Sequence, residues 1–298
     1  MGAWYPQRIT AILKLATRNE RLLGLAIRTP LLRKLLVCRA DAMSELHSPV
    51  IRDYVYQEFF TADDTSKQTS AGRFRDLDPI ACSLITDGRA AAIHDIGVSN
   101  GITSLELYRT LAARAIPLDF CISDKYAVYG SIGRCPVRII DAQGAVIELY
   151  VCGILGRRDP SVSNKFPVTR FLHWWLAGRP FCGPVRWFVL FDREVLEHIE
   201  RGEIRRIDYD VFTTRMPEAF SFVRCMNLLN LGYFPRESIQ VALRNVRESL
   251  RESGVLQIGR THPNGTSHAS FYRKRGTRLE ALQQVGGGTE LRELIAAL

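Results

Sequence analysis

The chain has 298 residues, of which 46% are hydrophobic and 24% are charged, so its composition is that of a globular protein and excludes wholesale disorder. The formal net charge is +9, which favours anionic partners in general. The basic residues are spread along the chain without a run of five or six, a pattern that argues against a nucleic-acid partner.

Cysteine and histidine usage favours a reduced protein without a metal site. The chain has 7 cysteines, an odd number, and no pair has Cys-x-x-Cys spacing, which is typical of buried thiols in a cytoplasmic protein. The 6 histidines are not spaced as partners for these cysteines, so we expect no metal. We also expect no signal peptide and no transmembrane helix, because no uncharged apolar stretch reaches about 18 residues.

The first 90 residues are predicted to form a helical cap or lid. Residues 7–38 carry apolar residues at helical spacing with basic residues between them, which predicts amphipathic helices. Such helices either lie on a membrane surface or pack as a cap on the following domain, and the sequence leaves both open. Residues 49–90 are interpreted as a helix, a polar loop and a second helix that Asp78 and Pro79 begin.

From residue 91 the pattern becomes α/β. Residues 91–95 form a predicted buried strand, 97–101 a tight turn, 103–115 a helix and 118–124 a second strand. Strand, helix and strand in this order indicate a right-handed unit with parallel strands.

Residues 126–200 interrupt this order and are predicted to be an insertion in a domain spanning 91–298. The insertion contains a hairpin over 137–151 and an apolar stretch over 171–191, interpreted as a buried helix or as a patch that faces a membrane or partner. The remaining elements, in order, are predicted as strands over 204–212 and 220–227, a helix over 235–252, a strand over 255–260, an antiparallel pair over 269–285 and a helix over 290–298.

The clearest chemical signal is the turn after the first strand of this domain. Asp95, Gly97 and Gly101 lie between a strand and a helix, where glycine lets the backbone approach a ligand and the helix start offers unpaired N–H groups. Asp124 ends the second strand, at the position where an acid can bind both hydroxyls of a ribose.

Four stretches resemble the class I S-adenosylmethionine (SAM)-dependent methyltransferases and cover roughly residues 90–125 and 204–298. They are Asp95-Ile-Gly-Val-Ser-Asn-Gly, Asp124 after Cys-Ile-Ser, the run from Phe222 to Asn230, and the helix that leads to Ser253-Gly-Val-Leu-Gln-Ile-Gly. The resemblance implies a Rossmann-like mixed sheet with helices on both faces, and SAM as cofactor. A shorter likeness of the run from Arg224 to Leu229 to chemotaxis-receptor methyltransferases carries no substrate with it.

The resemblance also implies roles for individual residues. Gly97, Ser99, Asn100 and Gly101 would line the methionine and ribose parts of SAM, and Asp124 would bind the ribose diol. Asp95 would organise the loop or face the amino group through water, Asp210 would lie near the adenine, and Asn227 would face the sulfonium and the acceptor as a candidate catalytic residue.

The sequence departs from the family in three places. Ser99 replaces the middle glycine, and the 126–200 segment has no counterpart in a minimal domain. The chain also lacks an Asp-Pro-Pro-Tyr type motif, which argues against methylation of base or glutamine amino groups.

Several reactions remain open. We expect methyl transfer to a small-molecule acceptor, and a secondary metabolite is one candidate for that acceptor. The first alternative is a cyclase in which the amine of SAM attacks its own side chain to give azetidine-2-carboxylate and methylthioadenosine. The second is a non-catalytic protein with this fold. A NAD-dependent dehydrogenase would show Gly-x-Gly-x-x-Gly, which the turn lacks.

The segment before the α/β domain is predicted to fold over the cofactor. Its aromatic residues, with Tyr56 as a second candidate catalytic residue, would face the sulfonium, and Lys67 or Arg73 would pair with a carboxylate. His94 is interpreted as a core residue, and His262 and His268 as possible bases. The sequence leaves the acceptor and the oligomeric state undetermined. The predicted lid residues are Tyr54, Tyr56, Phe60, Lys67 and Arg73.

Overall fold

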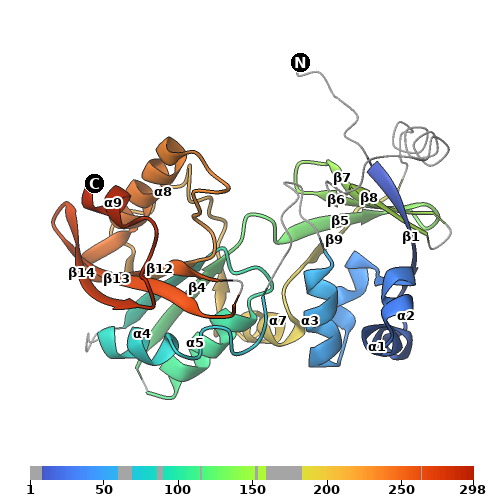
Figure 1. Cartoon of the computed structure of the whole chain (residues 1–298), viewed down its shortest axis with the longest axis horizontal. Helices are drawn as coiled ribbons and strands as arrows, with labels where there is room; N and C mark the ends of the chain where they lie inside the picture. The colour runs from blue at the N-terminus through green and yellow to red at the C-terminus, as the bar shows by residue number, and fades with distance from the viewer. Residues whose placement is uncertain are drawn as a thin grey trace. The chain divides into compact units, whose positions relative to one another are not determined.

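The chain folds into two units, which are described separately. The computed structural model describes residues 9–59, 69–85, 90–114, 116–151, 154–158, 183–262 and 264–298. Unit 1 comprises residues 1–69 and 126–193, and unit 2 comprises residues 70–125 and 194–298. Figure 1 shows both units and labels most of their elements.

Unit 1 is built on a seven-stranded sheet in the order β2-β1-β8-β7-β6-β5-β9. Neighbouring strands are antiparallel except β1 and β2, which are parallel. Its strands are β1 (Ile9–Thr17), β2 (Leu36–Cys38), β5 (Val128–Ile132), β6 (Val137–Asp141), β7 (Val146–Val151), β8 (Ile154–Arg158) and β9 (Arg186–Val189). Its helices are α1 (Glu20–Arg28), α2 (Pro30–Leu35), the 3-10 helix η1 (Ala40–Glu45) and α3 (Pro49–Gln57).

The helices of unit 1 supply much of its core. Leu23 of α1 and Val55 of α3 belong to the same buried cluster as Tyr129 of β5. Two polar contacts join α3 to residues 191 and 192, near the last residue of unit 1. Arg52 Nε lies 2.8 Å from Asp192 Oδ2, and the hydroxyl of Tyr56 donates to the carbonyl oxygen of Phe191 at 2.6 Å. Because these polar groups are buried, their pairing offsets the cost of removing them from water.

Three predictions for this part of the chain are wrong. Residues 9–17 form strand β1 instead of a helix, because they pair with β8 on one side and β2 on the other, and tertiary pairing overrides helical periodicity. Residues 186–189 likewise form strand β9, paired with β5, instead of a helix. The segments predicted as a separate N-terminal cap and an insertion share one sheet, so unit 1 replaces the predicted boundary at residue 90. The predicted helices within 20–35 and 49–57 and the hairpin of β6 and β7 are confirmed.

Unit 2 is a Rossmann-like α/β unit, as the sequence predicts. Its sheet has the order β10-β4-β3-β11-β12-β13-β14, in which the first five strands are parallel and the last two form an antiparallel hairpin. Numbered along the chain within this unit, the parallel strands follow the doubly wound order 3-2-1-4-5. The strands are β3 (Ala91–Ile96), β4 (Leu118–Ser123), β10 (Arg205–Arg206), β11 (Phe220–Met226), β12 (Leu250–Thr261), β13 (Ser267–Arg275) and β14 (Arg278–Val285).

Helices cover both faces of this sheet (Figure 1). One face carries α4 (Asp78–Leu84) and α5 (Ile102–Ala112), and the other carries α8 (Arg236–Ser249) and α9 (Arg292–Ala296). Helix α7 (Arg193–Glu200) precedes β10. On the α8 face, Ile239, Leu243 and Val246, spaced at helical intervals, are fully buried against residues of β11 and β12.

A buried ionic cluster joins the α4 and α5 face to the centre of the sheet. The guanidinium of Arg224 in β11 is fully buried and lies 3.0 Å from Asp78 Oδ1 of α4 and 2.5 Å from Asp95 Oδ2 of β3. It also donates to the carbonyl oxygen of Thr103 in α5 at 2.8 Å. Burial works against the charged guanidinium, but Asp95 and Asp78 raise the pKa of Arg224 above its usual value, so the charge is retained.

In the part of the chain that the structure describes, no helix is long and apolar enough to cross a membrane.

Replacing Arg224 with methionine will leave two carboxylates buried without their cation, so we expect the free energy of unfolding of unit 2 to fall by about 3–5 kcal/mol. The matched control is Arg205→Met, which removes the ion pair with Asp119, where both side chains are more than half exposed. An exposed pair contributes less than about 1 kcal/mol. Urea denaturation of the three proteins measures the difference, and equal losses would contradict a stabilising role for the buried cluster.

Candidate functional site

The candidate site lies where the carboxyl ends of the central strands of unit 2 meet. In open parallel sheets, ligands bind at the point where the strand order reverses, here between β3 and β11. The loop of residues 97–101 connects β3 to α5 at this point, and Gly97 and Gly101 adopt φ angles of +72° and +82°. A Cβ atom on Gly97 would lie 3.1 Å from Leu228 Cδ2, so both conformation and space require glycine there.

The loop after β3 is joined to the end of β4 by one hydrogen bond. The backbone N–H of Ser99 donates to Asp124 Oδ2 at 2.7 Å. Ser99 has a φ of +60°, in the left-handed region that residues other than glycine rarely adopt. The N–H of Gly97 donates to the carbonyl oxygen of Ser123 at 2.8 Å. The sequence-predicted residues Gly97, Ser99 and Asp124 therefore lie together.

Asn227 lies at the end of the neighbouring strand β11 and is held by β12. Its Oδ1 accepts a hydrogen bond from the backbone N–H of Thr261 at 2.7 Å, and its own N–H donates to the carbonyl oxygen of Gly259 at 2.9 Å. The hydroxyl of Thr261 in turn accepts from Arg73 Nε at 3.1 Å. The structure thus brings the predicted residues Asn227 and Arg73 to one edge of the sheet through Thr261, a residue that the sequence analysis missed.

Asp210 lies beside the end of β4. Its Oδ2 forms an ion pair with Lys125 Nζ at 3.1 Å, and Lys125 follows Asp124 directly in the chain. Its Oδ1 accepts from the backbone N–H of Phe212 at 3.0 Å, which fixes the turn after β10. The loops that carry Asp124 and Asp210 are therefore neighbours, as the parallel pairing of β4 and β10 requires.

Two other predicted residues have their side chains in the interior. The carboxylate of Asp95 accepts from Ser104 Oγ at 2.6 Å and from Arg224, so it orients the start of α5 from within the cluster. Asn100 is fully buried, and its Oδ1 accepts from the backbone N–H of Ile102 at 3.2 Å. Its Nδ2 has no hydrogen-bond partner among the residues that the structure describes. A buried amide donor without a partner lowers the stability of the fold, so a bound acceptor would stabilise this atom.

The histidines of unit 2 differ in their surroundings. His94 is fully buried, with Nε2 2.8 Å from Ser123 Oγ, and burial lowers its pKa to about 3, as expected of a neutral core residue. His262 directly follows β12, and His268 lies in β13. The centroids of their rings are 3.9 Å apart. The backbone N–H of Gly287 donates to His268 Nδ1 at 3.1 Å. Partial burial, with the nearby His268 and Arg260, lowers the pKa of His262, so its imidazole is uncharged at neutral pH.

The other predicted lid residues do not belong to this unit. Tyr54 and Tyr56 lie in α3 of unit 1, where Tyr56 is fully buried in the core and its hydroxyl is used by a backbone carbonyl. Tyr56 is therefore a core residue, and nothing in its surroundings supports a catalytic role. Phe60 and Lys67 lie outside the described residues.

Among the residues missed from the sequence, Thr261 and Lys125 share one signal. Thr261 is the last residue of β12 and Lys125 lies two residues after the end of β4, and side chains reach a ligand from such positions in this type of sheet. Leu228 was missed for a different reason, because its contact with Gly97 depends on the packing of two loops that are distant in sequence.

No model of a known protein family matches the chain, and no curated protein matches it. Solved structures resemble it at low identity. The 1,6-didemethyltoxoflavin-N1-methyltransferase of Burkholderia thailandensis, with bound S-adenosylhomocysteine, is 13% identical; the match covers 76% of this chain and 66% of that one, with a TM-score of 0.36. The N-methyltransferase NodS of Bradyrhizobium japonicum, also with S-adenosylhomocysteine, is 11% identical over 66% of each chain, with a TM-score of 0.33.

The CMeT domain of the citrinin polyketide synthase is 10% identical; the match covers 57% of this chain and 29% of that one, with a TM-score of 0.28. The chain thus spans between 29% and 66% of the length of these three proteins. The assignment of the fold itself rests on the strand order of unit 2.

A double-mutant cycle tests the close packing of the loop. Gly97→Ala and Gly202→Ala both place an alanine at a φ near +72°, but a Cβ on Gly202 meets no heavy atom within 4 Å. We expect both to lower the free energy of unfolding by about 1–2 kcal/mol for the backbone conformation, and Gly97→Ala to lose about 1 kcal/mol or more in addition. Adding Leu228→Ala should recover that extra loss. Identical losses for the two glycine variants would show that Leu228 does not confine the loop.

Proposed function

We propose that unit 2 binds SAM at the carboxyl ends of β3, β4 and β11 and that the protein is a SAM-dependent methyltransferase. The observation that carries the proposal is the hydrogen bond between the left-handed loop of residues 97–101 and Asp124 at the switch point of the sheet. In this arrangement a glycine-containing turn lies next to a carboxylate. Doubly wound sheets bind nucleoside cofactors with the same two features, a turn that the ligand can approach closely and an acid that binds the ribose.

The residues present fit such a cofactor. Gly97 allows the left-handed turn of the loop, where a Cβ atom would lie 3.1 Å from Leu228 Cδ2, and the buried Nδ2 of Asn100 has no hydrogen-bond partner among the described residues. We assign the ribose hydroxyls to Asp124, the methionine part to Gly97, Ser99 and Gly101, and the adenine end to the turn at Asp210. Asp95 acts indirectly, since its carboxylate positions the start of α5.

When bound, SAM supplies a methyl group on a positively charged sulfur. The chain has then to bind and align an acceptor and exclude water, which requires positioning more than covalent chemistry. Asn227, Thr261 and Arg73 form a continuous polar edge beside the loop, held by hydrogen bonds of 2.7 and 3.1 Å. We assign the acceptor to this edge and propose that it is a small molecule with polar groups.

Three of the aromatic residues that would support the cyclase alternative lie in the core of unit 1, and Phe60 lies outside the described residues. The cyclase reaction needs an aromatic surface around the sulfonium. Tyr54, Tyr56 and Phe59 are instead buried in the core of unit 1, where Phe59 packs edge-to-face on Tyr129 at 5.2 Å. We therefore retain methyl transfer as the proposed reaction.

Replacing Asp124 with alanine should weaken SAM binding by about 1.5–3 kcal/mol, the range for hydrogen bonds to a charged group, which is roughly a 10- to 150-fold rise in Kd. Asp119→Ala is the matched control, because Asp119 lies in β4, the strand that Asp124 directly follows, is exposed and pairs with Arg205. Isothermal titration calorimetry with SAM measures both. A folded Asp124→Ala protein with the affinity of the wild type would reject the role of Asp124.

The reaction itself is tested by incubating the protein with SAM and analysing the products by mass spectrometry. We expect S-adenosylhomocysteine to form only after addition of a small-molecule extract, below about 3 kDa, of cells that make the protein. Methylthioadenosine formed without any acceptor, faster than spontaneous decay, would overturn methyl transfer in favour of attack within SAM. Absence of both products together with absence of SAM binding would reject an enzymatic role.

A further inference from the structure

Unit 1 exposes leucine side chains on its first two helices. Leu22 and Leu25 of α1 are 44% and 53% exposed, and Leu31 and Leu35 of α2 are 68% and 46% exposed. Single exposed leucines are common on protein surfaces, but these four lie within 14 residues of chain, on two consecutive helices.

Two arginines lie on the same face of α1 as Leu25. Arg21 precedes Leu25 by four residues and Arg28 follows it by three, so the three side chains share one side of the helix. Leu23 and Ala26, which are fully buried, define the opposite side. Arg21 and Arg28 are exposed, and neither has an ion pair with any residue that the structure describes.

The acidic residue of α1, Glu20, forms no ion pair with these arginines among the described residues. The carboxylate of Glu20 accepts hydrogen bonds from the backbone N–H groups of His47 and Ser48, at 2.9 and 2.5 Å, and these bonds lower its pKa. The carboxylate of Glu20 therefore interacts with the backbone just before α3.

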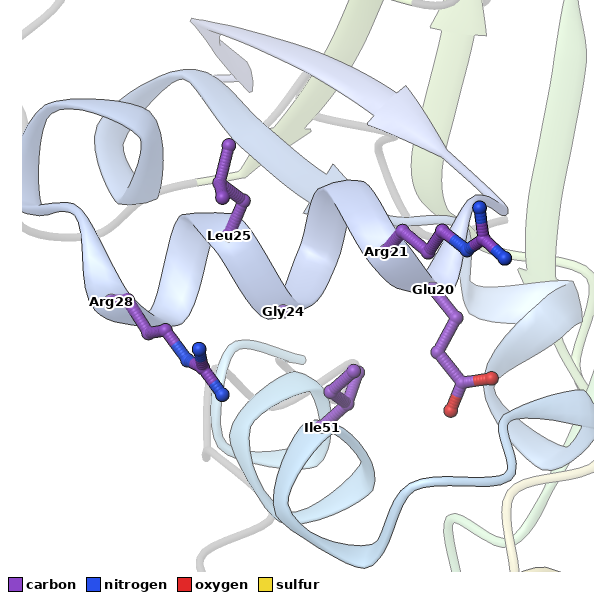
Figure 2. Close-up of a pocket in the computed structure, with 6 residues that line it drawn as sticks. All are labelled: Glu20, Arg21, Gly24, Leu25, Arg28 and Ile51. Carbon is purple, nitrogen blue, oxygen red and sulfur yellow. The ribbon is translucent and has the colours of Figure 1, made fainter.

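Between α1 and α3 the surface is hollowed (Figure 2). The hollow has a volume of about 440 Å³. Its apolar part is formed by Gly24, Leu25 and Ile51, and its charged part by Glu20, Arg21 and Arg28. A Cβ atom on Gly24 would lie only 3.4 Å from Ile51 Cδ1. Arg28 extends from α1 toward the side of α3, and Arg21 stands at the other end of the helix. An apolar depression with unpaired guanidinium groups at its ends suits an amphiphile with an anionic head.

We propose that this surface, here named the α1–α2 face, docks on a bilayer that contains anionic phospholipid. The guanidinium groups contact lipid phosphates, and the exposed leucines enter the acyl boundary, as in other basic amphipathic helices that lie on membranes. A second copy of the chain is a poorer occupant, because it would bring four unpaired arginines together. The α1–α2 face consists of Arg21, Leu22, Leu25, Arg28, Leu31 and Leu35.

Vesicle co-sedimentation of the full chain tests this proposal. We expect binding to vesicles of phosphatidylcholine with 30% phosphatidylglycerol, weaker binding in 0.5 M NaCl, and little binding to pure phosphatidylcholine. Each arginine near an anionic surface contributes about fivefold to partitioning, so Arg21→Gln with Arg28→Gln should reduce binding about 25-fold. Leu25→Gln with Leu31→Gln keeps the charge and should also reduce binding at least tenfold, because buried apolar area is lost.

The matched control is Arg215→Gln with Arg244→Gln. Both arginines are exposed residues of unit 2 without an ion pair among the described residues, so the net charge changes equally. Circular dichroism and thermal melts establish that all variants remain folded. The proposal is overturned if the wild type does not sediment with anionic vesicles, if the control loses as much binding as the arginine variant, or if the leucine variant binds as the wild type does.

Discussion

The buried guanidinium of Arg224 is the interaction on which the candidate site depends. It reaches from the centre of β11 to Asp95 in β3, Asp78 in α4 and the backbone of Thr103 in α5. These elements frame the loop of residues 97–101, so the ionic cluster determines where the loop lies, and the glycines of the loop allow its conformation. A buried cation with two carboxylates is costly unless every member is paired, which makes the arrangement of the elements strict.

The same cluster explains why the sequence indicates the residues of the candidate site better than the residues that hold them in place. The glycine turn, Asp124 and Asn227 could be predicted because each ends a strand whose hydrophobic pattern is local. The role of Asp95 was harder to assign, because a carboxylate beside a glycine loop suits a ligand contact, whereas its partner Arg224 lies 129 residues away. Thr261 joins Asn227 to Arg73 through hydrogen bonds that span 34 and 188 residues of sequence, which no local pattern reveals.

Unit 1 was predicted less well for a related reason. Strand β1 pairs with β8, whose residues lie more than 130 positions later, so the helical periodicity of residues 7–38 is a correct guide only for α1 and α2. Helix formation there still follows local signals, since Asn19 caps α1 and Pro30 begins α2. Because α1 buries only Leu23 and Ala26 fully, its remaining leucine and arginine side chains stay available at the surface.

The central claim is that SAM binds at the switch point of unit 2, and a crystal structure of the protein with S-adenosylhomocysteine tests it most directly. The account predicts that both ribose hydroxyls lie within hydrogen-bond distance of the Asp124 carboxylate and that the amino-acid part follows the loop of residues 97–101. A ligand bound elsewhere on the chain, or a ribose turned away from Asp124, would contradict it.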